Sequence, residues 1–190
     1  MSKLCIEDET IENMDFIAIP FTSKEYEGCK FLHCSFAKAD LSNFRFVECS
    51  FTDCDWSNAK LLTTTLNDIR FVDCKLLGLH FESCSDFLFS VSFQNCTLNF
   101  SSFYQRQLKK TVFKNSVLQE VDFTDADLTG SVFDTCDLGK AVFDNTILEK
   151  VDFRTAYNYA IDPERNKLKK AKFDRIGLAG LLGKYDIDIS

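Results

Sequence analysis

Nine cysteines and two histidines are the first side chains to consider for metal binding or redox chemistry in this 190-residue sequence. Zinc sites and redox pairs typically use a Cys-X-X-Cys spacing, which the sequence lacks. His33 and His80 fall at positions that we expect to point outward, so they make a poor additional ligand set. We therefore expect no metal site and no cofactor.

Eight of the cysteines share one position of a five-residue repeat, where the side chain is expected to be small and to point inward. They are Cys29, Cys34, Cys49, Cys54, Cys74, Cys84, Cys96 and Cys136. At such a position cysteine acts as a small hydrophobic residue. Cys34, Cys54 and Cys74 are predicted to stack in one column, and a reducing cytosol favours free thiols over disulfides there. The predicted role is a ladder of structural thiols.

Aspartates are the second group that could act chemically, as general bases. They recur singly, directly before a large apolar residue, at Asp122, Asp127, Asp137 and Asp152. A general base needs a pocket, and the interior predicted below is filled by phenylalanine and leucine. We therefore expect no catalytic residues and no enzyme activity. Most of these aspartates are interpreted as turn-compatible, solubilising residues.

The elements that position these side chains follow a period of five, which is clearest in residues 111–153. A large apolar residue stands at every fifth position there: Phe113, Leu118, Phe123, Leu128, Phe133, Leu138, Phe143, Leu148 and Phe153. The residue two positions earlier is always small or β-branched. Because five is neither the 3.6-residue period of a helix nor the two-residue period of a strand, the pattern indicates a repeat architecture.

A five-residue unit can be a short extended segment plus one bend, with its large and small residues pointing inward. One unit cannot bury its apolar face alone, so the units must wind into coils that stack about 4.8 Å apart. Phenylalanine and leucine also alternate along the repeat. Four units per coil would stack like on like, whereas three would mix them, so the alternation favours a four-sided coil.

The segment Ala126-Asp127-Leu128-Thr129-Gly130 matches the A(D/N)LXX signature of the pentapeptide-repeat family, which nearly the whole chain resembles. This resemblance implies an all-β fold, a right-handed quadrilateral β-helix (pentapeptide-repeat solenoid) with a short C-terminal helix. We expect the β-helix to span residues 16–173, preceded by an acidic N-terminal cap at residues 1–15.

Two segments interrupt the repeat. Residues 82–92 contain two residues more than the frame allows, and the old frame would bury Asp86, so a bulge or bend is expected that exposes Phe87 or Phe89. Residues 156–166 are predicted to form a distorted coil.

The core slots of that distorted coil are occupied by Asn158 and Pro163, which do not suit a core. Beyond it, residues 174–190 differ in kind. Leucines at helical spacing predict a short helix there, and three glycines make it too weak to stand alone, so it must pack on something. The segment could cap the last coil or pair two subunits, and the sequence does not decide between these two roles.

The C-terminal segment also resembles the terminal module of pentapeptide-repeat proteins in the Qnr and albicidin- or microcin-immunity group. The resemblance implies a homodimer whose rod mimics B-form DNA and binds DNA gyrase or topoisomerase IV. The predicted dimer interface comprises Ile176, Leu178, Leu181, Leu182, Tyr185 and Ile187. Unlike Qnr proteins, which project a large loop from a late coil, this chain keeps its frame through residues 101–113.

Charge is uneven along the chain, which carries a formal net charge of −7. Acidic stretches suit a partner with a basic groove and repel nucleic acid. The predicted partner-binding residues form acidic faces: Glu120, Asp122, Asp125, Asp127, Asp134, Asp137, Asp144 and Asp152. Basic clusters at residues 106–114 and 165–175 offset them. A duplex as long as the predicted rod would carry about twenty negative charges, so any mimicry must rest on shape and local acidic faces.

The sequence leaves three functions to distinguish. The first is a non-enzymatic, dimeric protector of a type II topoisomerase against a poison. The second is an interaction scaffold with an unrelated partner, and the third, an enzyme, lacks any set of catalytic residues. Because no apolar run could span a bilayer and the acidic start does not resemble a signal peptide, we expect a cytoplasmic protein with no membrane partner. Because the acidic stretches repel nucleic acid, we also expect no direct nucleic-acid contact.

Overall fold

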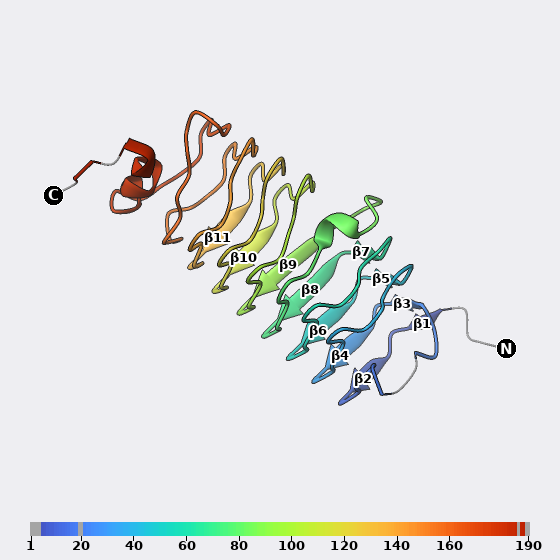
Figure 1. The fold of residues 1–190 in the computed structure, drawn as a ribbon. Coiled ribbons are helices and arrows are strands. Elements are labelled where there is room, and N and C mark those ends of the chain that lie inside the picture. The colour runs from blue at the N-terminus through green and yellow to red at the C-terminus, as the bar shows by residue number, and fades with distance from the viewer. Residues whose placement is uncertain (1–4, 19–20, 186, 189–190) are drawn as a thin grey trace.

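The computed structural model describes residues 5–18, 21–185 and 187–188, and it forms a rod of stacked coils (Figure 1). Two parallel sheets run along the rod. One contains β1 (Ile6–Glu7), β3 (Glu25–Glu27), β5 (Arg45–Val47) and β7 (Thr65–Asn67). The other contains β2 (Thr10–Glu12), β4 (Lys30–Leu32), β6 (Ser50–Thr52), β8 (Ile69–Val72), β9 (Val91–Gln94), β10 (Val112–Lys114) and β11 (Val132–Asp134).

Each coil has four sides, because pairing joins residues twenty apart, as in Phe31↔Phe51 and Phe113↔Phe133. We number the faces in chain order. Face I contains the column of β-bridges that includes Asp137, and face II contains the column that includes Asp122. Face III contains the sheet that begins with β1 and the column of bridges that continues it through Asp127. Face IV follows the β2 sheet and its continuation through Asp152. The fold is the predicted all-β quadrilateral β-helix of the pentapeptide-repeat type.

The core consists of columns of like side chains. On face IV, the Phe113 ring stacks on that of Phe133, with centroids 4.7 Å apart and planes within 4° of parallel. The Phe123 ring of face II meets Phe113 edge to face across the interior, at 6.1 Å between centroids. Leucines such as Leu118 and Leu128 are fully buried on the other two faces. The alternation of phenylalanine and leucine therefore produced the predicted like-on-like stacking.

The corners of the coil lie at residues with positive φ, two positions after the large core residue. At the corner between faces III and IV these are Lys110 (φ 58°), Gly130 (φ 72°), Lys150 (φ 58°) and Lys170 (φ 61°). The left-handed conformation turns the chain from one face to the next, and the outward-pointing corner side chains tolerate Asn, Asp, Gly or Lys.

The coil begins earlier than predicted. Ile6 pairs with Tyr26 and Ile11 pairs with Phe31, so residues 6–12 already form part of the β-helix. The prediction of a non-repeating cap at residues 1–15 is wrong for this part, and residues 1–4 lie outside the described chain. Ile6 and Ile11 precede Phe16 at the same five-residue spacing.

The distorted coil at residues 156–166 is present, but it fills the core differently from the repeat. Asn158 is exposed at a corner with φ of 60°, and Pro163 is exposed. Tyr159 and Ile161 are buried in their place. The coil thus shifts its core residues and remains part of the same solenoid.

The predicted C-terminal helix is replaced by two short 3₁₀ segments, η2 (Gly177–Leu181) and η3 (Gly183–Tyr185), which end the rod (Figure 1). Close packing explains two of the glycines in this segment, because a Cβ on Gly177 or Gly180 would collide with Tyr159. No helix among the described residues is long and apolar enough to cross a membrane.

Candidate partner-binding surfaces

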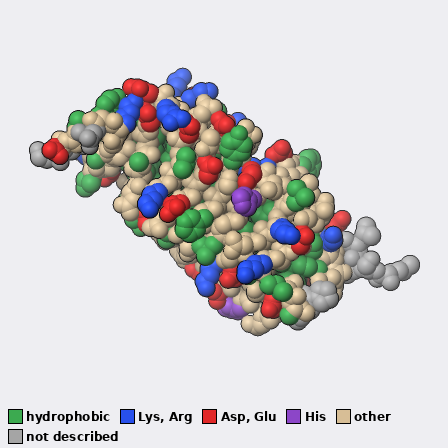
Figure 2. All heavy atoms as spheres, viewed as in Figure 1, with side chains coloured by type: hydrophobic (Ala, Val, Ile, Leu, Met, Phe, Trp, Pro, Cys, Tyr) green, Lys and Arg blue, Asp and Glu red, His purple; other side chains and the backbone are tan. Residues whose placement is uncertain are grey.

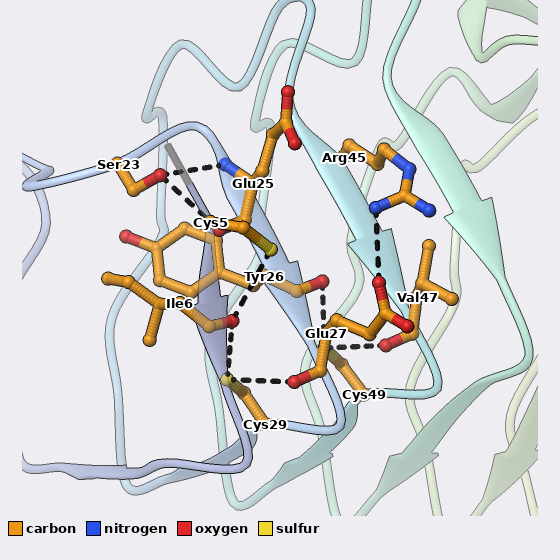
Figure 3. Close-up of polar contacts among 10 residues, drawn as sticks. All are labelled: Cys5, Ile6, Ser23, Glu25, Tyr26, Glu27, Cys29, Arg45, Val47 and Cys49. Atoms are coloured by element: carbon orange, nitrogen blue, oxygen red, sulfur yellow. Dashed lines mark hydrogen bonds and ion pairs between the residues drawn. The ribbon is translucent and has the colours of Figure 1, made fainter. Parts of the chain in front are cut away.

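The thiols belong to the interior. Cys29 Sγ donates to the carbonyl oxygens of Ile6 and Glu27, both at 3.4 Å, and Cys49 repeats this pattern one coil later, with Tyr26 and Val47 (Figure 3). The eight cysteines at the inward repeat position are all buried. Burial raises the pKa of the Cys49 and Cys136 thiols to about 12, which keeps them protonated and unreactive. No group of three potential metal ligands gathers among the described residues.

The predicted acidic residues are spread over all four faces. The members of the set lie as follows: Glu120, Asp122, Asp125 and Asp144 on face II or at its corners; Asp127 on face III; Asp134 and Asp152 on face IV; Asp137 on face I. Figure 2 shows acidic and basic side chains interspersed on the side in view, with no continuous acidic stripe. The largest group that the structure brings together is therefore the four residues around face II.

Asp127 and Asp137 serve the fold itself, because both are buried. Asp137 accepts hydrogen bonds from Gln119 Nε2 (2.7 Å) and Asn158 Nδ2 (2.8 Å). Burial opposes ionisation of Asp137, but these bonds and the Gly139 N–H outweigh it and lower its pKa. Asp127 likewise has a lowered pKa, since hydrogen bonds from Thr129 and the ion pair with Lys109 outweigh the cost of burial.

The other acidic residues also have partners at the surface. The Arg154 guanidinium lowers the pKa of Asp152 and lies 2.7 Å from its carboxylate. Asp144 pairs with Arg165 at 2.6 Å, and Glu120 with Lys140 at 3.7 Å. Exposed pairs of this kind contribute little stability and exchange readily, so the face II residues remain able to meet a partner.

Residues 86–89 form a loop that projects from face III, in the predicted bulge region. The 3₁₀ turn η1 (Phe81–Ser83) leads into the loop, and strand pairing resumes where Ser90 N donates to the Leu66 carbonyl at 2.9 Å. Phe87 is 71% exposed and Leu88 is 59% exposed. The predicted exposure of Phe87 is confirmed, whereas Phe89 packs against the Phe81 ring, with centroids 6.4 Å apart.

Arg106 holds this loop from inside the coil. It occupies a small, inward repeat position and is only 3% exposed. Its guanidinium donates to the carbonyl oxygens of Cys84 (3.2 Å) and Ser85 (3.0 Å), pairs with Asp86 and lies 4.0 Å from the centroid of the Phe89 ring.

The prediction that Arg106 belongs to a basic cluster on the surface is wrong. The available signal was its spacing, because Arg106 stands two residues before Leu108, where the repeat expects a small side chain. A long side chain at an inward position can be accommodated here because the preceding coil contains the insertion.

The C-terminal segment presents apolar side chains to solvent. Ile176 is 89% exposed, and Leu178, Leu182, Tyr185 and Ile187 are also exposed. Leu181, in contrast, packs against the core, so it acts as a capping residue. Lys184 attaches the segment to the distorted coil through ion pairs with Asp162 (2.9 Å) and Glu164 (2.7 Å). Five of the six predicted interface residues are therefore exposed at the end of the single chain.

A family of known sequences shares this repeat: the pattern described as "pentapeptide repeat region" matches residues 87–181, half of the chain. The chain is a pentapeptide-repeat protein. Its structure is similar to that of a trypsin-treated variant of QnrB1, a plasmid-mediated fluoroquinolone resistance protein, with a TM-score of 0.62. The two sequences are 17% identical, and the alignment covers 98% of this chain and 99% of the QnrB1 chain. At that identity the likeness concerns the fold alone.

Another solved structure that this pentapeptide-repeat protein matches is HetL, a pentapeptide-repeat protein involved in heterocyst differentiation regulation in Nostoc sp. strain PCC 7120. That match has a TM-score of 0.40 and 16% identity, over 89% of this chain and 86% of HetL. No curated protein matches the sequence.

Proposed function

We propose that this pentapeptide-repeat protein is a non-enzymatic binding rod that pairs through its C-terminal segment and protects DNA gyrase or topoisomerase IV against a poison. The observation that carries the proposal is the exposed apolar group at the C-terminal end of the rod: Ile176, Leu178, Leu182, Tyr185 and Ile187. Exposed apolar side chains gathered at one end mark an interaction site. Pairing about a two-fold axis would bury this surface and double the length of the rod.

The partner-facing surface we assign is the projecting loop together with face II. Phe87 and Leu88 supply exposed apolar side chains at the loop tip, and Arg106 holds the loop backbone in one conformation. A pre-ordered loop loses little entropy on binding. The carboxylates of Asp122, Asp125 and Asp144 lie on the adjoining face and suit a basic groove.

The proposal is tested by a gyrase supercoiling assay, with and without the protein, in the presence of several poisons. We expect the protein to restore supercoiling in the presence of at least one poison. The double substitution Phe87→Ser with Leu88→Ser should remove this protection, and Ile17→Ser, a matched exposed apolar position at 61% exposure on face I, should preserve it. Absence of protection against every poison, for gyrase and topoisomerase IV alike, would contradict the proposal.

The second candidate function is a scaffold for an unrelated partner. It is favoured by the dispersal of the predicted acidic residues over four faces, since a DNA-like surface needs them aligned. The two candidates differ in the supercoiling assay, because a scaffold has no effect on gyrase.

A further inference from the structure

Lysines that are far apart in the sequence are stacked at one corner of the rod. Lys110, Lys150 and Lys170 occupy the corner between faces III and IV, with Gly130 between the first two. Main-chain hydrogen bonds set this register: Gly130 N donates to Glu149 O at 2.8 Å, and Lys150 N donates to Lys169 O at 3.0 Å. At one coil per about 4.8 Å, the four corner residues span about 14 Å.

More lysines flank the corner. We define the lysine corner over four successive coils. In each coil it comprises the outward positions of face III, the corner residue between faces III and IV, and the outward position of face IV directly before the large core residue. Its charged members are Lys109, Lys110, Lys150, Lys167, Lys169, Lys170 and Lys172 with Asp127, Glu149 and Asp152. Seven lysines against three carboxylates give a local charge of +4, opposite in sign to the −7 of the whole chain.

Two of these lysines are neutralised within the fold. Lys109 lies 3.1 Å from the Asp127 carboxylate, and Lys172 lies 3.7 Å from that of Asp152. The other five are exposed and form no ion pair within the described part of the chain: Lys110, Lys150, Lys167, Lys169 and Lys170. Like charges on neighbouring strands repel one another, and an anionic partner would relieve this repulsion.

The shape of the corner selects among anionic partners. A corner is convex and carries lysines on its edge and on face III, so it fits a concave surface with negative walls better than a flat bilayer. The major groove of duplex DNA is about 12 Å wide and bounded by phosphates. A duplex presents a phosphate per about 1.7 Å, or about eight over the 14 Å of the corner, which is enough to meet five lysines.

The sequence of the corner also points to backbone contacts. Its outward positions hold no aromatic residue on which an unpaired base could stack. Lysine acts on phosphate as a point charge and reads no base edge by itself. We propose that the lysine corner binds the phosphate backbone of double-stranded nucleic acid without sequence preference. This is opposite to the expectation of no direct nucleic-acid contact, which rested on the acidic stretches of the sequence.

The test is fluorescence anisotropy of a labelled 24-base-pair DNA duplex of arbitrary sequence, titrated with the intact protein at several KCl concentrations. Five phosphate contacts predict a slope of log K against log salt of about −4.5. The triple substitution Lys110→Gln, Lys150→Gln and Lys170→Gln should reduce the slope to about −2. The matched control Lys38→Gln, Lys60→Gln and Lys75→Gln changes three exposed lysines on faces I and II, and should keep the parental slope.

A thermal melt of each variant by circular dichroism verifies that it is folded before its slope is compared. The proposal is overturned if the parent does not bind the duplex at 20 mM KCl, or if the corner and control variants weaken binding equally. Binding to anionic vesicles or to polyglutamate without binding to the duplex would overturn it as well. This inference does not depend on the proposed topoisomerase contact.

Discussion

Replacement of Arg106 by alanine should destabilise the β-helix and release the projecting loop. The arginine donates to two main-chain carbonyls, of Cys84 and Ser85, which lose their partner in Arg106→Ala. Each buried acceptor left unsatisfied costs about 1–3 kcal/mol, and loss of the desolvated contact with the Phe89 ring adds about 1–2 kcal/mol. Relief of the desolvation of the guanidinium offsets part of this cost. We expect a net loss of about 2–4 kcal/mol in the free energy of unfolding.

The matched variant is Asp86→Ala, which removes the ion pair but keeps the two carbonyl contacts. The Asp86 side chain is 98% exposed, so its loss should cost below about 1 kcal/mol. Urea unfolding measures both costs, and limited chymotrypsin cleavage at Phe87 reports release of the loop. Equal destabilisation by the two substitutions would mean that the ion pair, and not the backbone contact, holds the loop; a neutral Arg106→Ala would refute the clamp altogether.

Three further predictions concern the core, the thiols and the C-terminal segment. Phe123→Ala should lower the free energy of unfolding by about 3–5 kcal/mol, because the ring is stacked between Phe103 and Phe143. The control Thr124→Ala at the surface should lower it by about 0.5 kcal/mol or less. Equal melting temperatures for the two variants would contradict the five-residue frame. Titration with a thiol reagent should detect nine free cysteines in protein that is prepared without reductant and then denatured. In the native protein the reagent should react slowly with the eight buried cysteines. A lower count in the denatured protein would reveal disulfides. Gly180→Ala should destabilise the protein by about 2 kcal/mol in a thermal melt, since the new Cβ would collide with the Tyr159 carbonyl. The control Gly183→Ala should be neutral in the same melt, because no atom lies within 4 Å of the new Cβ. Equal effects of the two substitutions would contradict the packing of η2 on Tyr159.

The repeat itself could be predicted because every coil obeys the same rule. The five-residue period and the alternation of Phe113 with Leu118 favour a four-sided coil over a three-sided one, since four sides stack like on like and three would mix the two residue types. The same period could also have located the first coil, where Ile6 and Ile11 continue it.

The exceptions could not be predicted from the period, because each depends on contacts between coils. Arg106 points inward since the two inserted residues of the preceding coil leave carbonyls for it to bind, and no single unit reveals this. Tyr159 takes the place of Asn158 in the core, and Gly177 and Gly180 leave room for it, because a Cβ on either glycine would collide with Tyr159. The glycines looked like helix weaknesses in the sequence, and in the fold they are packing sites.

The candidate surfaces were predicted less well, because charge was summed along the chain and not along columns of the coil. Residues twenty apart lie side by side, so Lys150 and Lys170 are neighbours although a long acidic stretch precedes them. The acidic residues of that stretch, in contrast, lie on different sides of the coil, as Asp122 on face II and Asp137 on face I do.

The proposed rod depends on pairing at the C-terminal end, and light scattering coupled to size exclusion tests it most directly. The intact protein at micromolar concentration is predicted to have twice the chain mass of 21.8 kDa. Ile176→Asp combined with Leu178→Asp should yield a folded monomer, because both side chains are exposed in the single chain. An intact protein that elutes with the mass of one chain would contradict the dimer and the long rod on which the topoisomerase proposal rests.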